Sequence, residues 1–293
     1  MIGAMANVSQ PGASQDDRQR GTLARAAMMR RGGRDRKEGA VGRIRRRLRD
    51  RPRAMIPARS VKRTPHPTES ALNRLAHVQL EDALHYVASK HATGRLVDVG
   101  CGQKPYAELL SAFVTEHVGV DHPESPHSLE AADVLSSAYQ IPLESGSFDT
   151  ALLSEVIEHL EDPTAALAEV RRLLRPGGKV ILSAPFMWVL HEEPRDFYRY
   201  TPNGLRLILT DAGFEQITIW PISGQWSTVA LLFGYALRPY RVGPLRRMID
   251  GLALASQATA AWIDRNHFKP GGTYDHIAVA TNPADQPRRL SDP

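Results

Sequence analysis

Residues 96–102 read Leu96-Val97-Asp98-Val99-Gly100-Cys101-Gly102, an apolar strand that runs directly into a glycine turn. Glycine is needed where a backbone adopts positive φ or approaches a ligand closely, and such a turn presents amide groups at the start of the next helix. A Gly-x-Gly after a strand is also an ordinary connection between a strand and a helix. The stretch alone therefore predicts a strand and leaves the ligand open.

The segments on either side alternate between short apolar runs and helical patterns. Helical spacing extends from Glu69 to a stop at Gly94, and Asp162-Pro163 and Thr201-Pro202 are typical helix starts. The alternating segments are 96–99, 106–114, 117–120, 148–153, 163–175 and 179–184, with further strands at 215–220 and 276–281. This alternation predicts an α/β fold whose parallel sheet is covered by helices on both faces. A helical insertion at about 225–266 precedes the last strand. Its apolar side chains need a partner surface, which could be the core, a second subunit or a membrane face.

Charge is distributed unevenly along the 293 residues. Residues 1–63 contain 18 Lys and Arg against 5 Asp and Glu, a net charge of +13, which leaves 19 and 27, a net charge of −8, for the remainder. We expect residues 1–64 to be a disordered basic tail, 65–283 to be the folded domain, and 284–293 to be a disordered C-terminus. The tail could be merely solvated, could contact anionic lipid or nucleic acid, or could be a transit peptide.

Cysteine content and hydropathy limit the class of protein. Cys101 is the only cysteine, so no intrachain disulfide can form, and a zinc site would need His and carboxylate ligands alone. No metal-ligand spacing is visible, so we expect no metal, although scattered carboxylates leave a divalent ion open. The apolar run 229–237 is far shorter than the roughly 20 residues that span a bilayer. We expect a cytoplasmic protein that is at most peripheral to the membrane.

A second cofactor-type feature follows about 20 residues after the glycine turn. Val118-Gly119-Val120-Asp121 ends the second strand with a carboxylate. In dinucleotide-binding sheets an acid at this place accepts hydrogen bonds from ribose hydroxyls. The ends of two neighbouring strands are thus expected to contact one nucleoside-like ligand.

Three further motifs make a family resemblance specific. They are Ser147-Phe148-Asp149, then Ser154-Glu155-Val156-Ile157-Glu158-His159-Leu160, then Leu174-Arg175-Pro176-Gly177-Gly178-Lys179. With the first two features, they resemble the class I S-adenosylmethionine-dependent methyltransferases, type 11-like, over about residues 70–281. The resemblance implies a Rossmann-like seven-stranded sheet whose last strand is antiparallel, and S-adenosyl-L-methionine as cofactor.

The resemblance also implies cofactor-binding residues. The residues that match the family's positions are Asp98, Gly100, Cys101, Gly102, Asp121, His122, Asp133, Val134, Ser154 and Glu155. Within this set Asp121 would bind the ribose, His122 would flank the adenine, and Asp133 with Val134 would reach the adenine edge. The family's third loop glycine is absent, and Gln103-Lys104-Pro105-Tyr106 stands in its place. This departure puts the detailed loop contacts in doubt.

A later segment resembles a smaller group within these methyltransferases. Three stretches resemble small methyltransferases of bacterial glycan and secondary-metabolite pathways: Pro185-Phe186-Met187, the run from His191 to Thr201, and Ala212-Gly213-Phe214. Enzymes of that group often act on sugars or lipid-linked compounds, and we expect a small or lipid-linked acceptor that is methylated at oxygen. The alternatives are an RNA methyltransferase anchored by the basic tail, which the acidic domain argues against, and a non-catalytic binding protein with the same fold.

Two histidines are candidate catalytic residues. An oxygen acceptor must lose its proton, and His191 follows the fifth strand at the carboxyl edge of the sheet. It could equally be a loop histidine held by Asp196 or Arg199. His159 is the rival base or a structural residue. Candidate substrate-binding residues are Arg195, Arg199 and Tyr200, which could instead brace the loop.

Overall fold

The computed structural model describes residues 65–284. The predictions for the tail of residues 1–64 concern residues outside this range, and so do those for the C-terminal residues 285–293.

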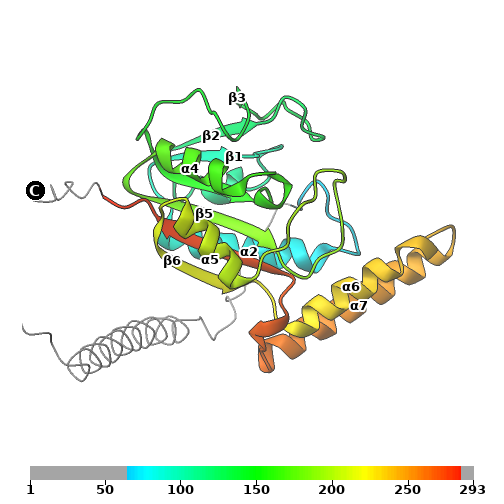
Figure 1. Ribbon diagram of the computed structural model, residues 1–293. Helices are drawn as coiled ribbons and strands as arrows, with labels where there is room; N and C mark the ends of the chain where they lie inside the picture. The colour runs from blue at the N-terminus through cyan, green and yellow to red at the C-terminus, as the bar shows by residue number, and fades with distance from the viewer. Residues whose placement is uncertain (1–64, 285–293) are drawn as a thin grey trace, which may run out of the picture. The chain divides into compact units, whose positions relative to one another are not determined.

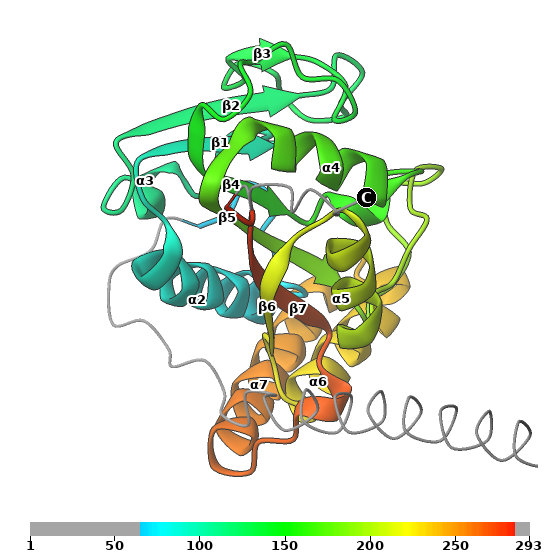
Figure 2. The same ribbon diagram turned by 60° about the vertical axis from the view of Figure 1, so that its left-hand side comes forward.

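A seven-stranded sheet forms the centre of the described fold. Its strand order is β3-β2-β1-β4-β5-β7-β6, and β3 and β6 lie at opposite edges (Figure 2). The strands are β1 (Arg95–Val99), β2 (Glu116–Asp121), β3 (Val134–Leu135), β4 (Phe148–Ser154), β5 (Leu174–Pro185), β6 (Glu215–Pro221) and β7 (Asp275–Thr281). Strand β7 runs antiparallel to both β5 and β6, while β1 to β5 are parallel. The predicted fold class and the reversed last strand are therefore confirmed.

Helices cover both faces of the sheet (Figure 1). One face is packed against α4 (Pro163–Leu173) and α5 (Pro202–Asp211), and the other against α2 (Arg74–His91) and α3 (Ala107–Leu110). Strands β1, β4, β5 and β7 contribute to two cores, because successive side chains point to opposite faces. In β1, for example, Leu96 packs with the α2 side and Val97 with the α4 side.

The predicted helix starts are confirmed at two places. The Asp162 side chain accepts a hydrogen bond from the backbone nitrogen of Ala165, and Thr201 accepts one from Gly204. Each caps an otherwise unpaired amide, and a proline at the next position has its φ already set for a helix.

Three local predictions were wrong. The first helix begins at Arg74 rather than Glu69, and only Ala107–Leu110 of the predicted segment 106–114 is α-helical. Gly94 does not cap the first helix, which ends at His91. Its φ of +59° instead turns the chain into β1 beside Asp149, where an added Cβ would lie 1.9 Å from a carboxylate oxygen. Close approach, rather than helix termination, explains this glycine.

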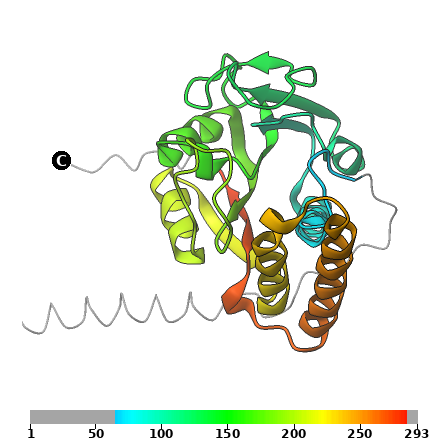
Figure 3. The same cartoon turned by 90° about the vertical axis from the view of Figure 1, so that its right-hand side faces the viewer.

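The helical insertion consists of α6 (Gln225–Ala236), the short 3-10 helix η2 (Arg238–Tyr240) and α7 (Leu245–Asn266). The two long helices lie side by side next to α2 (Figure 3). Leu231, Ile249 and Ala253 are buried, so part of the apolar surface packs within the chain. Trp226, Phe233 and Trp262 remain exposed. No helix within residues 65–284 is both long and apolar enough to cross a membrane.

Candidate active site

A cavity of about 880 Å³ lies at the carboxyl edge of the sheet, where β1, β2, β4 and β5 end. Open α/β sheets bind ligands at this edge. The cavity is lined by eleven of the residues that the sequence singled out: Asp98, Gly100, Cys101, Gly102, Asp121, His122, Ser154, Glu155, His159, His191 and Arg195. The fold thus brings most of the candidate residues to one place.

The glycine loop forms one end of the cavity. The backbone nitrogens of Gly100 and Cys101 both donate to the carbonyl oxygen of Val120, at 2.8 and 3.1 Å, which fixes the loop against β2. Gly100 and Gly102 have φ of +74° and +50°, a region that favours glycine. A Cβ added to Gly102 would meet no described atom within 4 Å, so the loop leaves open space on that side.

Asp121 stands beside this loop and is 6% exposed. Its Oδ2 accepts a hydrogen bond from Gly102 and its Oδ1 accepts one from His122, both at 2.7 Å from backbone nitrogens. The ring of His122 is fixed in turn, because the backbone nitrogen of Glu124 donates to its Nδ1 at 3.1 Å. A carboxylate oriented in this way keeps free lone pairs for ligand hydroxyls.

Asp98 at the end of β1 and Cys101 in the glycine loop are both buried. The carboxylate of Asp98 accepts from Nε2 of His117 at 2.9 Å. Burial, followed by the charge of Asp98, raises the pKa of the Cys101 thiol to about 12. The thiol is therefore protonated at neutral pH and is not a nucleophile.

Two acidic groups line the cavity near the end of β4: Glu155, which follows β4, and Asp275, which begins β7. Glu155 has a φ of +54°, rare for a residue with a side chain, and its backbone nitrogen donates to Oγ of Ser183 at 3.1 Å. Ser154 approaches the same hydroxyl at 3.2 Å. Burial, and next the Glu155 carboxylate, raises the pKa of Asp275 well above its usual value. Strained backbone and crowded carboxyl groups are features of functional sites.

Asp133 and Val134, the predicted adenine-edge residues, do not line the cavity. The Asp133 carboxylate accepts from Nζ of Lys104 at 2.5 Å and from the backbone nitrogen of Gly119 at 2.7 Å. The following segment, Ser136–Tyr139, lines the cavity instead. Lys104 is one of the four residues that stand in place of the family's third loop glycine, and its contact with Asp133 gives it a structural role.

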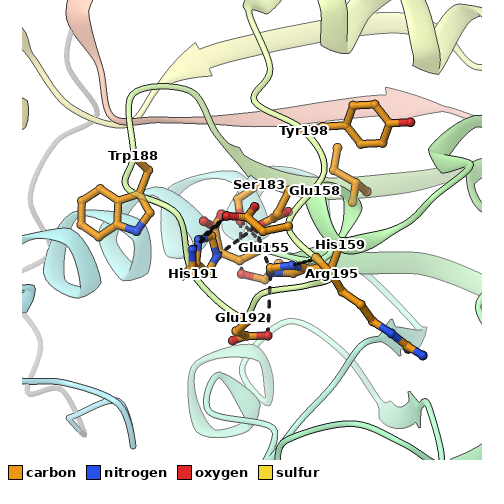
Figure 4. A network of polar contacts seen from close by, with 12 residues as sticks. Glu155, Glu158, His159, Ser183, Trp188, His191, Glu192, Arg195 and Tyr198 are labelled. Atoms are coloured by element: carbon orange, nitrogen blue, oxygen red, sulfur yellow. Dashed lines mark hydrogen bonds and ion pairs between the residues drawn. The ribbon is translucent and has the colours of Figure 1, made fainter.

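His159 and His191 come together at the other end of the cavity (Figure 4). His159 lies in the 3-10 helix η1 (Ile157–His159) and His191 lies in the loop after β5, yet their rings meet edge to face with centroids 4.9 Å apart. Glu158 lies behind them and is completely buried. Burial, and next the charge of Glu155, raises the pKa of Glu158 well above its usual value.

The loop that carries His191 is held by an ion pair. Arg199 donates to Asp196 at 2.5 and 2.7 Å, and its guanidinium also donates to the carbonyl oxygens of Trp188 and Val189. The hydrogen bond from Arg199 lowers the pKa of Asp196 to about 2. Asp196 in turn accepts from the backbone nitrogen of His191 at 2.9 Å. Arg199 therefore braces the loop, which is one of the two roles expected for it.

Tyr200 and Arg195 have different positions. Tyr200 is buried, does not line the cavity, and donates its hydroxyl to the carbonyl oxygen of Ile157 at 3.2 Å. Arg195 lines the cavity, its guanidinium lies 3.2 Å from Glu124, and its side chain is 55% exposed. Of the three predicted substrate-binding residues, only Arg195 is placed where it can touch a ligand in the cavity.

Sequence reasoning missed an aromatic wall and an acid. Trp188 packs edge to face with Tyr235 of α6 at 5.0 Å and lies 5.6 Å from Tyr274, and all three line the cavity. They come from three separate segments, so no local pattern connects them. Glu158 belongs to a motif quoted from the sequence, but the sequence assigned it no role. Only its burial beside two histidines identifies it as a candidate functional residue.

The residues present fit S-adenosylmethionine. Gly102 leaves room where a Cβ would otherwise project, and Asp121 offers oriented carboxylate oxygens next to it. Ligand pockets usually measure about 300–1,000 Å³. The cavity of about 880 Å³ can therefore hold a nucleoside-sized cofactor and a small acceptor together.

Comparisons with known proteins agree with this geometry. Residues 97–182 match the family model described as a methyltransferase domain. The chain is 32% identical over 155 residues to an uncharacterised 37.1 kDa protein of a Streptomyces fradiae transposon, covering 43% of this chain and 45% of that protein. It is 32% identical over 115 residues to the ubiquinone biosynthesis O-methyltransferase of Xanthomonas oryzae, covering 34% and 47%. The chain thus spans less than half the length of these two relatives.

One solved structure supports the fold. The crystal structure of the [4+2]-cyclase SpnF aligns with a TM-score of 0.51 at 20% identity, over 76% of this chain and 89% of that one. That protein is named as a cyclase, so the shared fold does not by itself specify a reaction. Residues 97–182 thus form a methyltransferase domain, and the strand order and glycine-loop geometry around them support a class I S-adenosylmethionine-dependent methyltransferase.

Proposed function

We propose that this protein transfers the methyl group of S-adenosylmethionine to an oxygen of a small acceptor. The observation that carries the proposal is a single cavity with two chemically different ends. The glycine loop and Asp121 form one end, and His159, His191 and the Trp188 wall form the other. Relatives described as O-methyltransferases support oxygen as the atom that is methylated.

The cofactor end belongs to Asp98, the glycine loop, Asp121 and His122. When bound, S-adenosylmethionine supplies an already activated methyl group, so alignment of the acceptor accounts for most of the catalysis. Trp188, Tyr235 and Tyr274 offer apolar faces that suit a ring or a lipid chain. An acceptor from a glycan or secondary metabolite, free or lipid-linked, fits this wall and the resemblance of the His191 loop.

The acceptor hydroxyl must lose its proton before or during transfer. His191 lines the cavity next to His159 and is our candidate general base. Its backbone is fixed by Asp196 and Arg199, so the imidazole is presented from a braced loop. Arg195, at the rim, is the candidate for binding a polar or anionic part of the acceptor.

The proposal is tested with the full-length chain and methyl-labelled S-adenosylmethionine. Phenols, sugars, prenylated quinols, amines and total RNA are offered separately, and the labelled product is identified by mass spectrometry. We expect oxygen-methylated small molecules. Labelling of RNA alone, at a rate that falls steeply with salt, would instead support the RNA methyltransferase alternative.

The non-catalytic alternative makes a different prediction. A binding protein would take up S-adenosylmethionine in calorimetry and label no acceptor in the panel or in bacterial small-molecule and lipid extracts. Failure to bind the cofactor at all would contradict both readings.

A further inference from the structure

We propose that Glu158, His159 and His191 form a binding site for a divalent first-row transition-metal ion at the acceptor end of the cavity. The site deepens the proposed function, since it concerns the same acceptor end. Its support is geometric and independent of which acceptor is methylated.

Three ligand atoms converge on one point. Nε2 of His159 lies 3.7 Å from Oε1 of Glu158, and Nε2 of His191 lies 4.0 Å from the same oxygen. The three ligand atoms lie within 4.8 Å of one another. Atoms bound at about 2.1 Å to one ion are typically about 3.0–3.5 Å apart, so a side-chain movement of about an ångström would close the site.

Hydrogen bonds orient both imidazoles with Nε2 facing the acid. Nδ1 of His159 lies 2.6 Å from the carbonyl oxygen of Arg195. Nδ1 of His191 lies 3.3 Å from the carbonyl oxygen of Val189 and 3.4 Å from Oδ2 of Asp196. Because these oxygens can only accept, each Nδ1 is the donor, and each Nε2 of the neutral ring keeps its lone pair. Metal-binding histidines typically donate their second nitrogen in this way.

Glu158 supplies a second and independent indication. Its side chain is completely buried, and neither carboxyl oxygen has a hydrogen-bond partner among residues 65–284. A buried carboxyl group without a partner costs free energy that a bound cation would offset. The main chain of Glu158 is fixed, because its carbonyl oxygen accepts from Phe197 at 2.9 Å and Tyr198 at 3.3 Å. These bonds connect η1 to the loop that carries His191.

Two of the three side chains of the site face the cavity. His159 and His191 line the cavity, whereas Glu158 does not. An ion held by three protein ligands would keep free positions toward the cavity, as in catalytic metal sites. Glu192, whose Oε2 lies 3.9 Å from Nε2 of His159, stands at that opening. Two imidazoles and one carboxylate favour zinc, iron, cobalt or manganese over magnesium and calcium.

An ion in this position changes the role assigned to His191. The Nε2 lone pair can take a proton or bind a metal, but it cannot do both. With the ion bound, His191 is a ligand, and the ion lowers the pKa of an acceptor hydroxyl that binds to it, so that the proton leaves to solvent. Sensitivity to chelators therefore separates the two roles.

The test uses the full-length chain, freed of metal with a chelator and then dialysed. Co²⁺ is added and its visible ligand-field absorption is recorded, and Zn²⁺ binding is measured by calorimetry, both without cofactor or acceptor. We expect one ion per chain, intensified Co²⁺ absorption typical of nitrogen ligands in a distorted site, and an increase in Tm with added Zn²⁺. Mg²⁺ should bind at least about tenfold more weakly.

Two ligand variants and one control complete the design. Glu158→Gln and His191→Ala should each weaken Co²⁺ binding at least about tenfold and abolish the Tm increase. His191 lies in a loop and is partly exposed, so its variant tests the site even if Glu158→Gln fails to fold. His127→Gln is the matched control, because His127 lines the same cavity but belongs outside the trio. Its binding should equal that of the parent.

Equal Co²⁺ binding by the parent and the His191 variant would overturn the metal site, and so would absence of binding by the parent. Neither result touches the proposed methyl transfer, which is scored by labelled product. If oxygen acceptors are labelled but Co²⁺ does not bind, the methyltransferase proposal stands and the metal site fails. If Co²⁺ binds as expected but no acceptor is labelled, the reverse holds.

Discussion

The backbone nitrogen of Gly102 donates a hydrogen bond of 2.7 Å to Oδ2 of Asp121. This bond joins the loop after β1 to the last residue of β2, so the two cofactor features that the sequence shows separately form one rigid unit. Neighbouring parallel strands bring their carboxyl ends to the same edge, which is why residues 19 positions apart can meet there.

Replacement of Asp121 should weaken cofactor binding. Asp121→Ala removes charge-assisted hydrogen bonds of about 1.5–3 kcal/mol, so the Kd for S-adenosylmethionine should rise at least tenfold in calorimetry. Asp133→Ala is the matched carboxylate control, because Asp133 is held by Lys104 and Gly119 and does not line the cavity. A tenfold loss in the control would instead support the adenine-edge contact that the resemblance implies. Unchanged affinity of Asp121→Ala would remove it from the cofactor site.

Replacement of His191 should slow turnover without affecting the cofactor. His191→Ala should lower kcat about a hundred- to ten-thousandfold, because the residue faces the acceptor, while the Kd for the cofactor stays constant. His85→Ala serves as control, since His85 packs against Phe113 and does not line the cavity. Full activity of the His191 variant would contradict both a base and a ligand role. For His159, a lowered Tm with kcat preserved would instead indicate a structural residue.

Gly94 should not tolerate a side chain. Gly94→Ala places a Cβ 1.9 Å from Oδ2 of Asp149 at a φ of +59°, which displaces a carboxylate that accepts from the backbone nitrogen of Arg95 at 2.8 Å. We expect a loss of about 2–4 kcal/mol in the free energy of unfolding, measured by denaturant titration. Gly251→Ala is the control: Gly251 lies within α7 with no described atom near its added Cβ, so stability should rise by up to about 1 kcal/mol. Equal effects at both positions would refute the close-approach explanation.

Stability should depend on pH through Glu169. Its carboxylate accepts from Arg172 at 2.8 Å and from the backbone nitrogen of Ile141 at 2.7 Å, and the bond from Arg172 lowers the pKa of Glu169 below its usual 4.5. The stabilisation is therefore complete above the unfolded-state pKa and is lost as pH falls through the folded-state pKa. Glu169→Gln should lower stability by about 1–2 kcal/mol at pH 7, and the difference from the parent should shrink below about pH 4. Glu130→Gln, at an exposed position, should show little difference at either pH. A constant Glu169→Gln difference from pH 7 to pH 3 would contradict the assignment.

The basic N-terminal residues should be dispensable for the folded domain. A chain that begins at Pro65 should keep the Tm and cofactor affinity of the full chain, because the removed residues are rich in Arg, Gly and Ala and have no apolar pattern that could bury a face. Differential scanning calorimetry measures the first property and titration the second. A loss of several degrees in Tm would show that the removed residues pack on the domain.

The sequence alone predicted the α/β class and the strand ends that form the proposed cofactor site, and the family resemblance added the antiparallel last strand. These depend on local patterns: a strand into a glycine turn at 96–102, an acid at the end of the next strand, and capped helix starts at Asp162 and Thr201. Such patterns connect residues that are close in sequence or fixed by strand ends, and the family's spacing extends them. Hence the sequence alone could assign Gly102 and Asp121 to the same ligand.

Tertiary structure alone decided the acceptor end. Glu158 and His191 are 33 residues apart, and their approach depends on the path of the loop after β5, which Arg199 and Asp196 hold. The place of Tyr235 in the same cavity depends on how α6 packs beside α2. Neither relation has a periodic signature, because each is fixed by side-chain packing between distant segments. The same reason explains why the buried carboxyl of Glu158, which has no hydrogen-bond partner among residues 65–284, is recognised only in the folded chain.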